Sequence, residues 1–270
     1  MYHNYSRLIS NQSIRQNTLR VFVRLVLSAS SVFLILQCGL DIENPTPPSK
    51  PQWVPKSLPE EWPERGIDAH KSGGIFLEWE PNPVEENITS YMLNRAEYFE
   101  FEDSLGNFEI LSTLVLESSS ALEYIDINAT MSTRYYYVLV AEDASENQST
   151  PSDTLGYMHF FATNSASMIP NGFSIALGAN RKLRWYYMYA VDIENFTITI
   201  LSADNGLILR RELTPDNYIG GTEYFTVPDT LVLTPANIYK WRVDTGGRYV
   251  DGRETVGSES AWATFLYRGP

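Results

Sequence analysis

IFLEWE, residues 75–80, alternates apolar and polar side chains almost throughout. Successive side chains of an extended chain point to opposite sides, so Ile75, Leu77 and Trp79 would share one face and the two glutamates the other. The Pro-Asn-Pro run at 81–83 would end the strand. This stretch therefore predicts a half-buried β-strand that places a tryptophan in a core.

Similar segments follow at short intervals through the first half of the chain. In the segment at 134–142, the side chains of Tyr135, Tyr137, Leu139 and Ala141 fall on one face. Seven short strands in about 100 residues, without an amphipathic helix, predict an antiparallel β-sandwich. The other predicted strands span 88–97, 108–114, 123–129 and about 152–162, and a first-strand or turn region holds His70.

The second half of the chain repeats the layout of the first. Three aromatic landmarks recur at offsets of 104 to 106 residues. A nearly constant offset indicates an internal duplication, and hence two sandwiches in tandem. The pairs are Trp79 with Trp185, Tyr91 with Phe196, and Tyr135 with Tyr239.

These landmarks resemble those of fibronectin type III domains. ATMSTRYYYVLVA at 129–141 is similar to the run that precedes and forms a core strand of that family, and LTPANIY at 233–239 fits the pattern more closely. The resemblance implies two immunoglobulin-like sandwiches with core tryptophans. It also implies tyrosine corners, in which the hydroxyls of Tyr135 and Tyr239 reach backbone a few residues upstream. Trp262 is expected on the final strand, packed on the second core.

The acidic charge is concentrated in the first predicted sandwich. The formal net charge is −13, and residues 61–162 hold 19 acidic residues against four basic ones, whereas residues 163–270 hold 11 against ten. A nucleic-acid-binding protein needs Lys and Arg to neutralise phosphates, so we expect no nucleic acid partner. The acids are scattered, without a D-x-D-x-D-G loop, so solubility explains them better than calcium binding does.

A basic segment and an apolar run mark residues 1–37 as a predicted signal helix. VFVRLVLSASSVFLIL at 21–36 is short for a membrane span and follows an arginine-containing, acid-free segment. ILQCG at 35–39 resembles the lipobox of bacterial lipoproteins, which implies a lipid anchor on Cys38 after cleavage. The alternative is an ordinary signal anchor with an incidental buried cysteine.

A proline-rich stretch follows this cysteine. Residues 38–62 hold six prolines, which favours an extended, semi-rigid tether. The tether would lead to a first sandwich at 63–162 and a second at 163–270. Asp41 and Glu43 resemble the surface-export signals of some lipoproteins. The expected location is therefore the cell envelope, anchored in the membrane, at the outer membrane or the cell surface.

Catalytic motifs are missing from the sequence. The three histidines, His3, His70 and His159, form no HExxH motif and no pair at metal-ligand spacing, and no G-x-S-x-G elbow occurs. The single cysteine rules out a Cys-rich zinc site and an internal disulfide. A small sandwich filled by its own side chains offers no deep cleft for paired acids. We therefore expect no enzyme activity, no catalytic residue, no cofactor and no metal.

Two aromatic segments are candidates for an interaction surface. In YFEFE at 98–102 and WYYMY at 185–189, neighbouring aromatic side chains must point both ways, so some should be exposed. The alternative is that they pack between the domains or under a long loop. The candidate residues are Tyr98, Phe99, Phe101, Tyr187 and Tyr189.

The sequence leaves three functions open. The leading hypothesis is a non-catalytic, lipid-anchored envelope protein that presents two sandwiches to a protein or glycan partner, or serves as a spacer. The second is an accessory subunit that scaffolds an envelope enzyme or transport complex. The third is a hydrolase whose site the sequence does not reveal.

Overall fold

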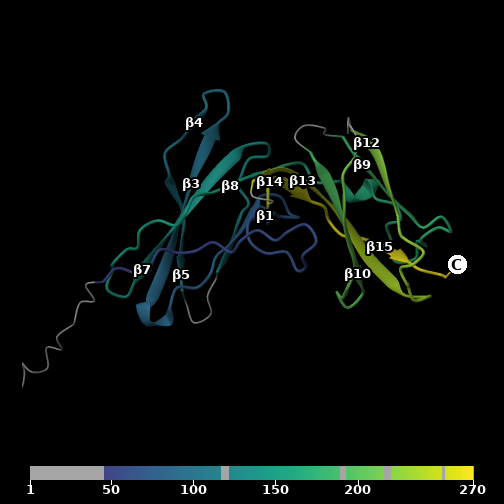
Figure 1. Cartoon of the computed structure of the whole chain (residues 1–270), viewed down its shortest axis with the longest axis horizontal. Coiled ribbons are helices and arrows are strands. Elements are labelled where there is room, and N and C mark those ends of the chain that lie inside the picture. The colour runs from purple at the N-terminus through teal and green to yellow at the C-terminus, as the bar shows by residue number, and fades with distance from the viewer. Residues whose placement is uncertain (1–45, 117–121, 189–192, 216–219, 251–252, 270) are drawn as a thin grey trace, which may run out of the picture. The chain divides into compact units, whose positions relative to one another are not determined.

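The computed structural model describes most of the chain after the predicted signal (Figure 1). The described residues form one compact unit. The predicted signal helix and Cys38 lie outside them. The described ranges are 46–116, 122–188, 193–215, 220–250 and 253–269.

Strands dominate these ranges, and the helical elements among them are two 3₁₀ turns, Val84–Glu86 and Ser165–Ser167. No α-helix occurs in the described part of the chain. The all-β prediction is therefore confirmed there.

The first sandwich packs two antiparallel sheets over an aromatic and aliphatic core. One sheet has the order β1-β2-β6, and the other runs β8-β7-β3, with β5 and β4 paired to successive parts of β3. Ile75, Leu77 and Trp79 are buried in this core, as predicted. The strands are β1 Asp68–Ala69, β2 Ile75–Glu78, β3 Ile88–Phe99, β4 Ser104–Leu105, β5 Glu109–Val115, β6 Glu123–Asp126, β7 Arg134–Asp143 and β8 Leu155–His159.

The second sandwich repeats this plan around its own core. A two-stranded sheet, β9-β12, faces a sheet in which β13 pairs with β10 through residues 239–246, with β15 at its start and with β14 at its end. Trp185, Phe196 and Trp241 are buried in this core. The strands are β9 Lys182–Tyr187, β10 Asn195–Ser202, β11 Leu207–Leu213, β12 Gly221–Thr226, β13 Ile238–Val250, β14 Arg253–Glu259 and β15 Ala263–Leu266.

Both tyrosine corners form. The hydroxyl of Tyr135 accepts a hydrogen bond from the backbone N–H of Thr130 at 3.4 Å, and that of Tyr239 accepts one from Thr234 at 2.8 Å. The shorter bond belongs to the copy that matches the family pattern more closely. These corners, with the two sheets of each sandwich, confirm the fibronectin type III-like fold.

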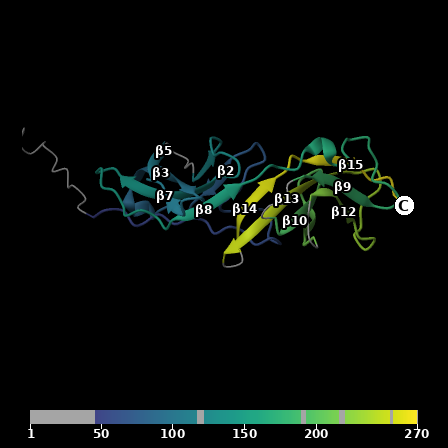
Figure 2. The same cartoon turned by 90° about the horizontal axis from the view of Figure 1, so that it is seen from above.

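One sheet continues from the first sandwich into the second, which the sequence analysis did not predict. Strand β14 lies between β13, to which it is antiparallel, and β8, to which it is parallel (Figures 1 and 2). Val256 stands opposite Met158, and the N–H of Phe160 donates to the carbonyl of Gly257 at 2.8 Å. The expectation of purely antiparallel sheets is wrong at this pair, because the β13–β14 hairpin turns β14 into the direction of β8.

A glycine permits this close approach of strands. A Cβ atom on Gly257 would lie 2.5 Å from the hydroxyl of Tyr157 and 2.9 Å from the carbonyl oxygen of Thr245. Tyr157 is completely buried and donates a hydrogen bond to Glu254 at 3.1 Å. A side chain at position 257 would therefore displace a buried, hydrogen-bonded group of the other sandwich.

The predicted tether needs correction where the structure describes it. Residues 48–66, here called the strap, pack on both sandwiches, whereas 38–62 was expected to be an extended, semi-rigid tether that leads to the first sandwich. The prediction took the prolines as the sign of a tether. Proline has no backbone N–H to donate, however, and it is therefore also tolerated at the edge of a sheet. Residues 38–45 lie outside the described ranges.

The strap forms an extra edge beside β2. The ring of Trp53 meets that of Trp79 edge-on at 6.2 Å, and the N–H of Val54 donates to the carbonyl of Glu78 at 3.0 Å. Farther along, the carbonyl of Pro59 accepts a hydrogen bond from Arg210 of the second sandwich at 2.6 Å. The strap thus bridges the two sandwiches.

Candidate interaction surface

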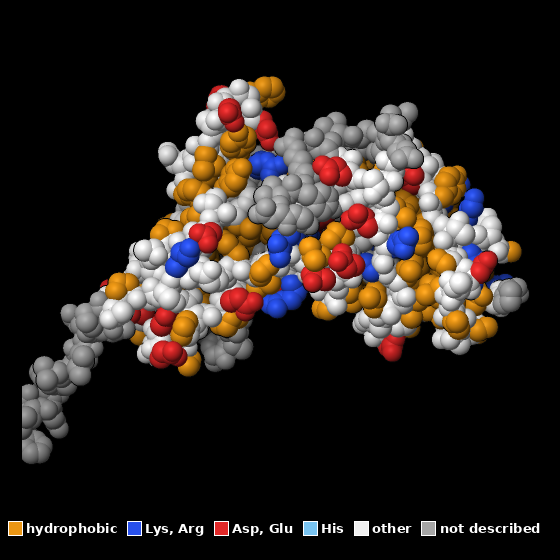
Figure 3. Space-filling model, in the orientation of Figure 1, with side chains coloured by type: hydrophobic (Ala, Val, Ile, Leu, Met, Phe, Trp, Pro, Cys, Tyr) orange, Lys and Arg blue, Asp and Glu red, His pale blue; other side chains and the backbone are white. Residues whose placement is uncertain are grey.

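Strand β3 extends beyond the end of the first core, so the last residues of its inner face are exposed. Alternate residues of a strand share a face, and on this face Tyr91 and Leu93 are buried whereas Glu97 and Phe99 are exposed. The chain returns through β4 and β5, so the overhang is a hairpin. Figure 3 shows hydrophobic and acidic side chains gathered at its tip, near the label β4 of Figure 1.

This hairpin contains one of the two predicted aromatic segments and extends it. Tyr98 is partly buried and its hydroxyl is hydrogen-bonded to Asp103, whereas Phe99 is exposed and Phe101 is fully exposed. Sequence reasoning missed the members from the returning strand, because a predicted strand does not reveal which of its sides lacks a cover. The apolar hairpin, as we call it, consists of Phe99, Phe101, Leu105, Phe108 and Ile110.

A hollow of about 450 Å³ opens beside the hairpin. The guanidinium of Arg95 lies 4.5 Å from the ring centroid of Tyr135 and pairs with the buried carboxylate of Asp126 at 2.7 Å. The positive charge of Arg95 is therefore already neutralised. Glu97 and Glu109 also line the hollow, and neither has an ion-pair partner within the described ranges.

The second aromatic segment, at 185–189, does not lie on the surface in the way that the sequence predicted. Tyr187 is only 2% exposed and packs on Phe196 with ring centroids 5.8 Å apart, so its assignment to a surface is wrong. The cause is the alternation of β9, which turns Leu183, Trp185 and Tyr187 inward. Tyr186 is exposed instead, and Tyr189 lies outside the described residues.

The outer side of the β9-β12 sheet combines aromatic and basic side chains. Arg184 stands directly across from Tyr224, and the Lys182 ammonium lies 5.4 Å from the Tyr224 ring centroid. Within the described residues of β9 and β12, no acidic side chain lies on this side. We call it the basic face; its exposed side chains are Lys182, Arg184, Tyr186, Thr222, Tyr224 and Thr226.

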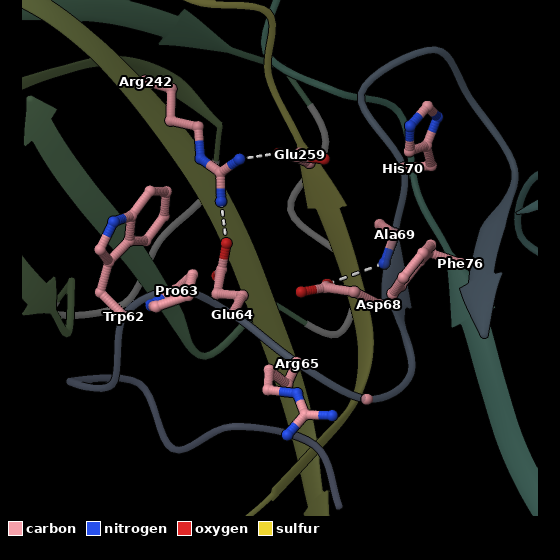
Figure 4. Close-up of a pocket in the computed structure, with 11 residues that line it drawn as sticks. Trp62, Pro63, Glu64, Arg65, Asp68, Ala69, His70, Phe76, Arg242 and Glu259 are labelled. Carbon is pink, nitrogen blue, oxygen red and sulfur yellow. Dashed lines mark hydrogen bonds and ion pairs between the residues drawn. The ribbon is translucent and has the colours of Figure 1, made fainter. Parts of the chain in front are cut away.

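A charged cluster fills the joint between the sandwiches and the strap. In Figure 4 the guanidinium of Arg242 lies between the carboxylates of Glu64 and Glu259 and pairs with both. The ammonium of Lys56 pairs with Asp68 and with Glu254. Three bases thus face five acids: Lys56, Arg210 and Arg242 against Glu64, Asp68, Asp244, Glu254 and Glu259.

Burial, together with the excess of acids, changes the pKa values in this joint cluster. Burial raises the pKa of Asp244 to about 7, although Arg242 opposes it, and its Oδ1 has no hydrogen-bond partner among the described residues. Burial likewise raises the pKa of Glu254 to about 7, opposed by Lys56. Burial would also raise the pKa of Glu64, but the surrounding cations outweigh it and lower that pKa. The cluster therefore contains two carboxyl groups that titrate near neutral pH.

Two tryptophans and several cations stack at the edge of this cluster. The rings of Trp62 and Trp262 meet edge-on at 6.3 Å, and the Arg242 guanidinium lies 5.5 and 5.1 Å from their centroids. The prediction that Trp262 packs on the second core is wrong. Its neighbour Ala263 occupies the inward position, so alternation turns Trp262 to the outer side.

A cavity of about 210 Å³ beside Arg242 is also part of the joint (Figure 4). Its charged walls, including Glu64 and Glu259, are paired with Arg242. Burial and the neighbouring Lys71 lower the pKa of His70, another of its lining residues. Because these charged groups are already paired with one another, they hold the two sandwiches together and leave no charge in the wall, as far as the structure describes it, to be explained by a ligand.

The remaining titratable candidate is internal. His159 is buried, and its Nε2 lies 2.9 Å from the carbonyl oxygen of Ala129. Burial lowers the pKa of His159. Within the described ranges, no three His, Cys, Asp or Glu side chains come together in a way that could hold a metal ion.

Over the described ranges, no helix has both the length and the apolar character needed to cross a bilayer.

Comparison with known proteins yields a structural likeness. No family model matches the chain, and no curated protein matches it. Among solved structures it is similar to the FN1-FN3 domains of chicken CNTN1, at 13% identity and a TM-score of 0.32, over 82% of this chain and 69% of that chain.

Proposed function

We propose that this chain is a non-catalytic, lipid-anchored protein of the bacterial cell envelope that presents its apolar hairpin to a protein partner. The observation that carries the proposal is the set of five exposed apolar side chains on one overhang, rimmed by acids. An exposed apolar patch with a polar rim is typical of a protein interaction site.

The composition of the hairpin favours a protein partner over a glycan. Large apolar side chains in a desolvated centre carry most of the energy of protein interfaces, and Phe101 and Phe99 would supply them. A sugar platform needs polar groups that fix the hydroxyls beside a flat ring. The Tyr98 hydroxyl, the polar group of the nearest ring, is already engaged by Asp103.

The joint favours a second candidate function, the scaffolding of an envelope enzyme or transport complex. The continuous β8–β14 pairing and the paired charges around Arg242 hold both sandwiches and the strap together. A braced pair of domains keeps two binding surfaces at a fixed separation, which a scaffold needs. The apolar hairpin would then bind another subunit of the complex.

The anchor has its own test. We expect the full chain expressed in a bacterial host with a labelled fatty acid to carry the label, because the lipobox-like segment provides a single thiol. Cys38→Ala should remove the label and release the protein from the membrane fraction. Unlabelled wild-type protein would remove the anchor from the proposal and leave the hairpin untouched.

The hairpin is tested by its contacts in cells. A photo-crosslinking residue at Phe101 should give an adduct of defined mass at least about tenfold more strongly than one at Val84, which is 89% exposed on the same sandwich. The double variant Phe99→Ser/Phe101→Ser should reduce capture of that partner about tenfold, and yet change the free energy of unfolding by less than about 0.5 kcal/mol. Equal adducts from both positions would contradict this assignment.

A further inference from the structure

We propose that the apolar hairpin of one copy docks on the basic face of a second copy of this chain, so that molecules associate head to tail. The inference rests on the proposed function, since both require the hairpin to be a binding surface. It adds the identity of a partner, because the complementary surface is present on the same chain.

Charge is the first observation that matches the two surfaces. Glu97 and Glu109 flank the hollow beside the hairpin, and residues 96–133 contain eight acids and no Lys, Arg or His. On the other surface Lys182 and Arg184 are exposed, and neither pairs with an acid among the residues described. Unpaired acids facing unpaired bases raise the association rate and fix the orientation of a contact.

The apolar parts of the two surfaces also match. The hairpin offers the rings of Phe99 and Phe101, and the basic face offers Tyr186 and Tyr224, all of them exposed. Aromatic rings pair edge-to-face, and guanidinium groups stack on rings, so both sets can be covered at once. The hollow beside the hairpin can receive a long side chain such as that of Arg184.

The location of the two surfaces sets the type of assembly. One lies on the first sandwich and the other on the second, so the contact joins unlike surfaces and can repeat from copy to copy. A contact of this type forms a ring if it closes and an open chain if it does not. Anchored copies share a membrane plane, which raises their effective concentration and favours a weak contact.

Charge reversal and its rescue test the inference. Sedimentation of the full chain in a non-ionic detergent should show association that grows with concentration and falls with salt. Glu97→Lys/Glu109→Lys and Lys182→Glu/Arg184→Glu should each weaken association at least about tenfold, and all four changes together should restore it. Glu85→Lys/Glu146→Lys, the same charge change at exposed acids elsewhere on the first sandwich, should leave it unchanged.

Phe101→Ser disrupts the proposed contact in a second way, because it removes an apolar side chain and leaves every charge in place. It too should weaken association at least about tenfold. Wild-type protein that stays monomeric at every concentration, or a quadruple variant that stays as weak as the double variants, would overturn head-to-tail docking. If a monomeric wild type still crosslinks through Phe101 to a different protein, the proposed function survives and the second copy is excluded as the partner.

Discussion

Replacing Lys56 with alanine should lower the free energy of unfolding by about 3–5 kcal/mol at neutral pH. The Lys56 ammonium lies between Asp68 and Glu254, 3.1 Å from the nearer Glu254 oxygen, and only 6% of its side chain is exposed. Without it, the carboxyl groups of Asp68 and Glu254 would face each other and the Tyr157 hydroxyl with no ammonium group between them. Urea unfolding followed by tryptophan fluorescence measures the loss.

The strap supplies a matched control in Lys50. This residue pairs with Asp153 at 2.9 Å, but 38% of its side chain and 80% of that of Asp153 are exposed. Lys50→Ala should therefore cost at most about 1 kcal/mol. Adding Asp68→Asn and Glu254→Gln to Lys56→Ala should recover most of the loss, because no uncompensated charge remains. Equal costs at Lys50 and Lys56 would show that the joint cluster does not brace the sandwiches.

The two cores were predictable because they depend on local periodicity. Ile75, Leu77 and Trp79 alternate with polar residues, and an extended chain with one buried face has only one way to place them. The same reasoning placed Trp185, since the duplication repeats the pattern, whereas the resemblance to fibronectin type III domains implied both tyrosine corners. Trp79 and Trp185 are each 1% exposed.

The joint was not predictable, because its contacts connect distant parts of the chain. The carbonyl of Lys56 accepts a hydrogen bond from Arg253, 197 residues away, and Glu64 pairs with Arg242. In the sequence these residues resemble ordinary solvated charges, and the strap resembles a spacer. Only the pairing of β14 with β8 brings them together, and no local pattern specifies a parallel pair between two repeats.

The predictability of the candidate interaction surface lies between these two cases. Strict alternation from Trp185 predicts that Tyr187 points inward. The assignment of Tyr187 to a surface was wrong because it did not apply the two-residue period of a strand to the aromatic run. Phe99 and Phe101 were found because apolar residues on both sides of a strand end cannot all be covered. Phe108 and Ile110 were missed because their exposure depends on β5 lying at the edge of its sheet.

Raising the pH from 5 to 8 should destabilise the folded protein by about 5 kcal/mol through the joint cluster, on the order of 2.5 kcal/mol from each of two carboxyl groups. Asp244 and Glu254 have pKa values raised to about 7 from ordinary values near 4, so between these limits the folded state holds protons that the unfolded state has released. Stability therefore falls as the pH rises through this window and levels off only once the pH has passed the folded pKa values, at about pH 8. Unfolding free energies from urea titrations at pH 5, 6, 7 and 8 measure the slope.

The variant Asp244→Asn isolates this effect from other titrations. It keeps an oxygen to accept the hydrogen bond from Arg242 and removes the ionisable group. The lowered pKa values of His70 and His159 act in the opposite direction, since their stabilisation is lost as the pH falls, but they contribute equally to both proteins. The lowered pKa of Glu64 changes the stability only at pH values below the ordinary pKa range of a glutamate, which lies outside this window. The wild-type slope should therefore exceed that of the variant, and identical slopes would mean that Asp244 stays ionised by sharing Arg242 and Arg210.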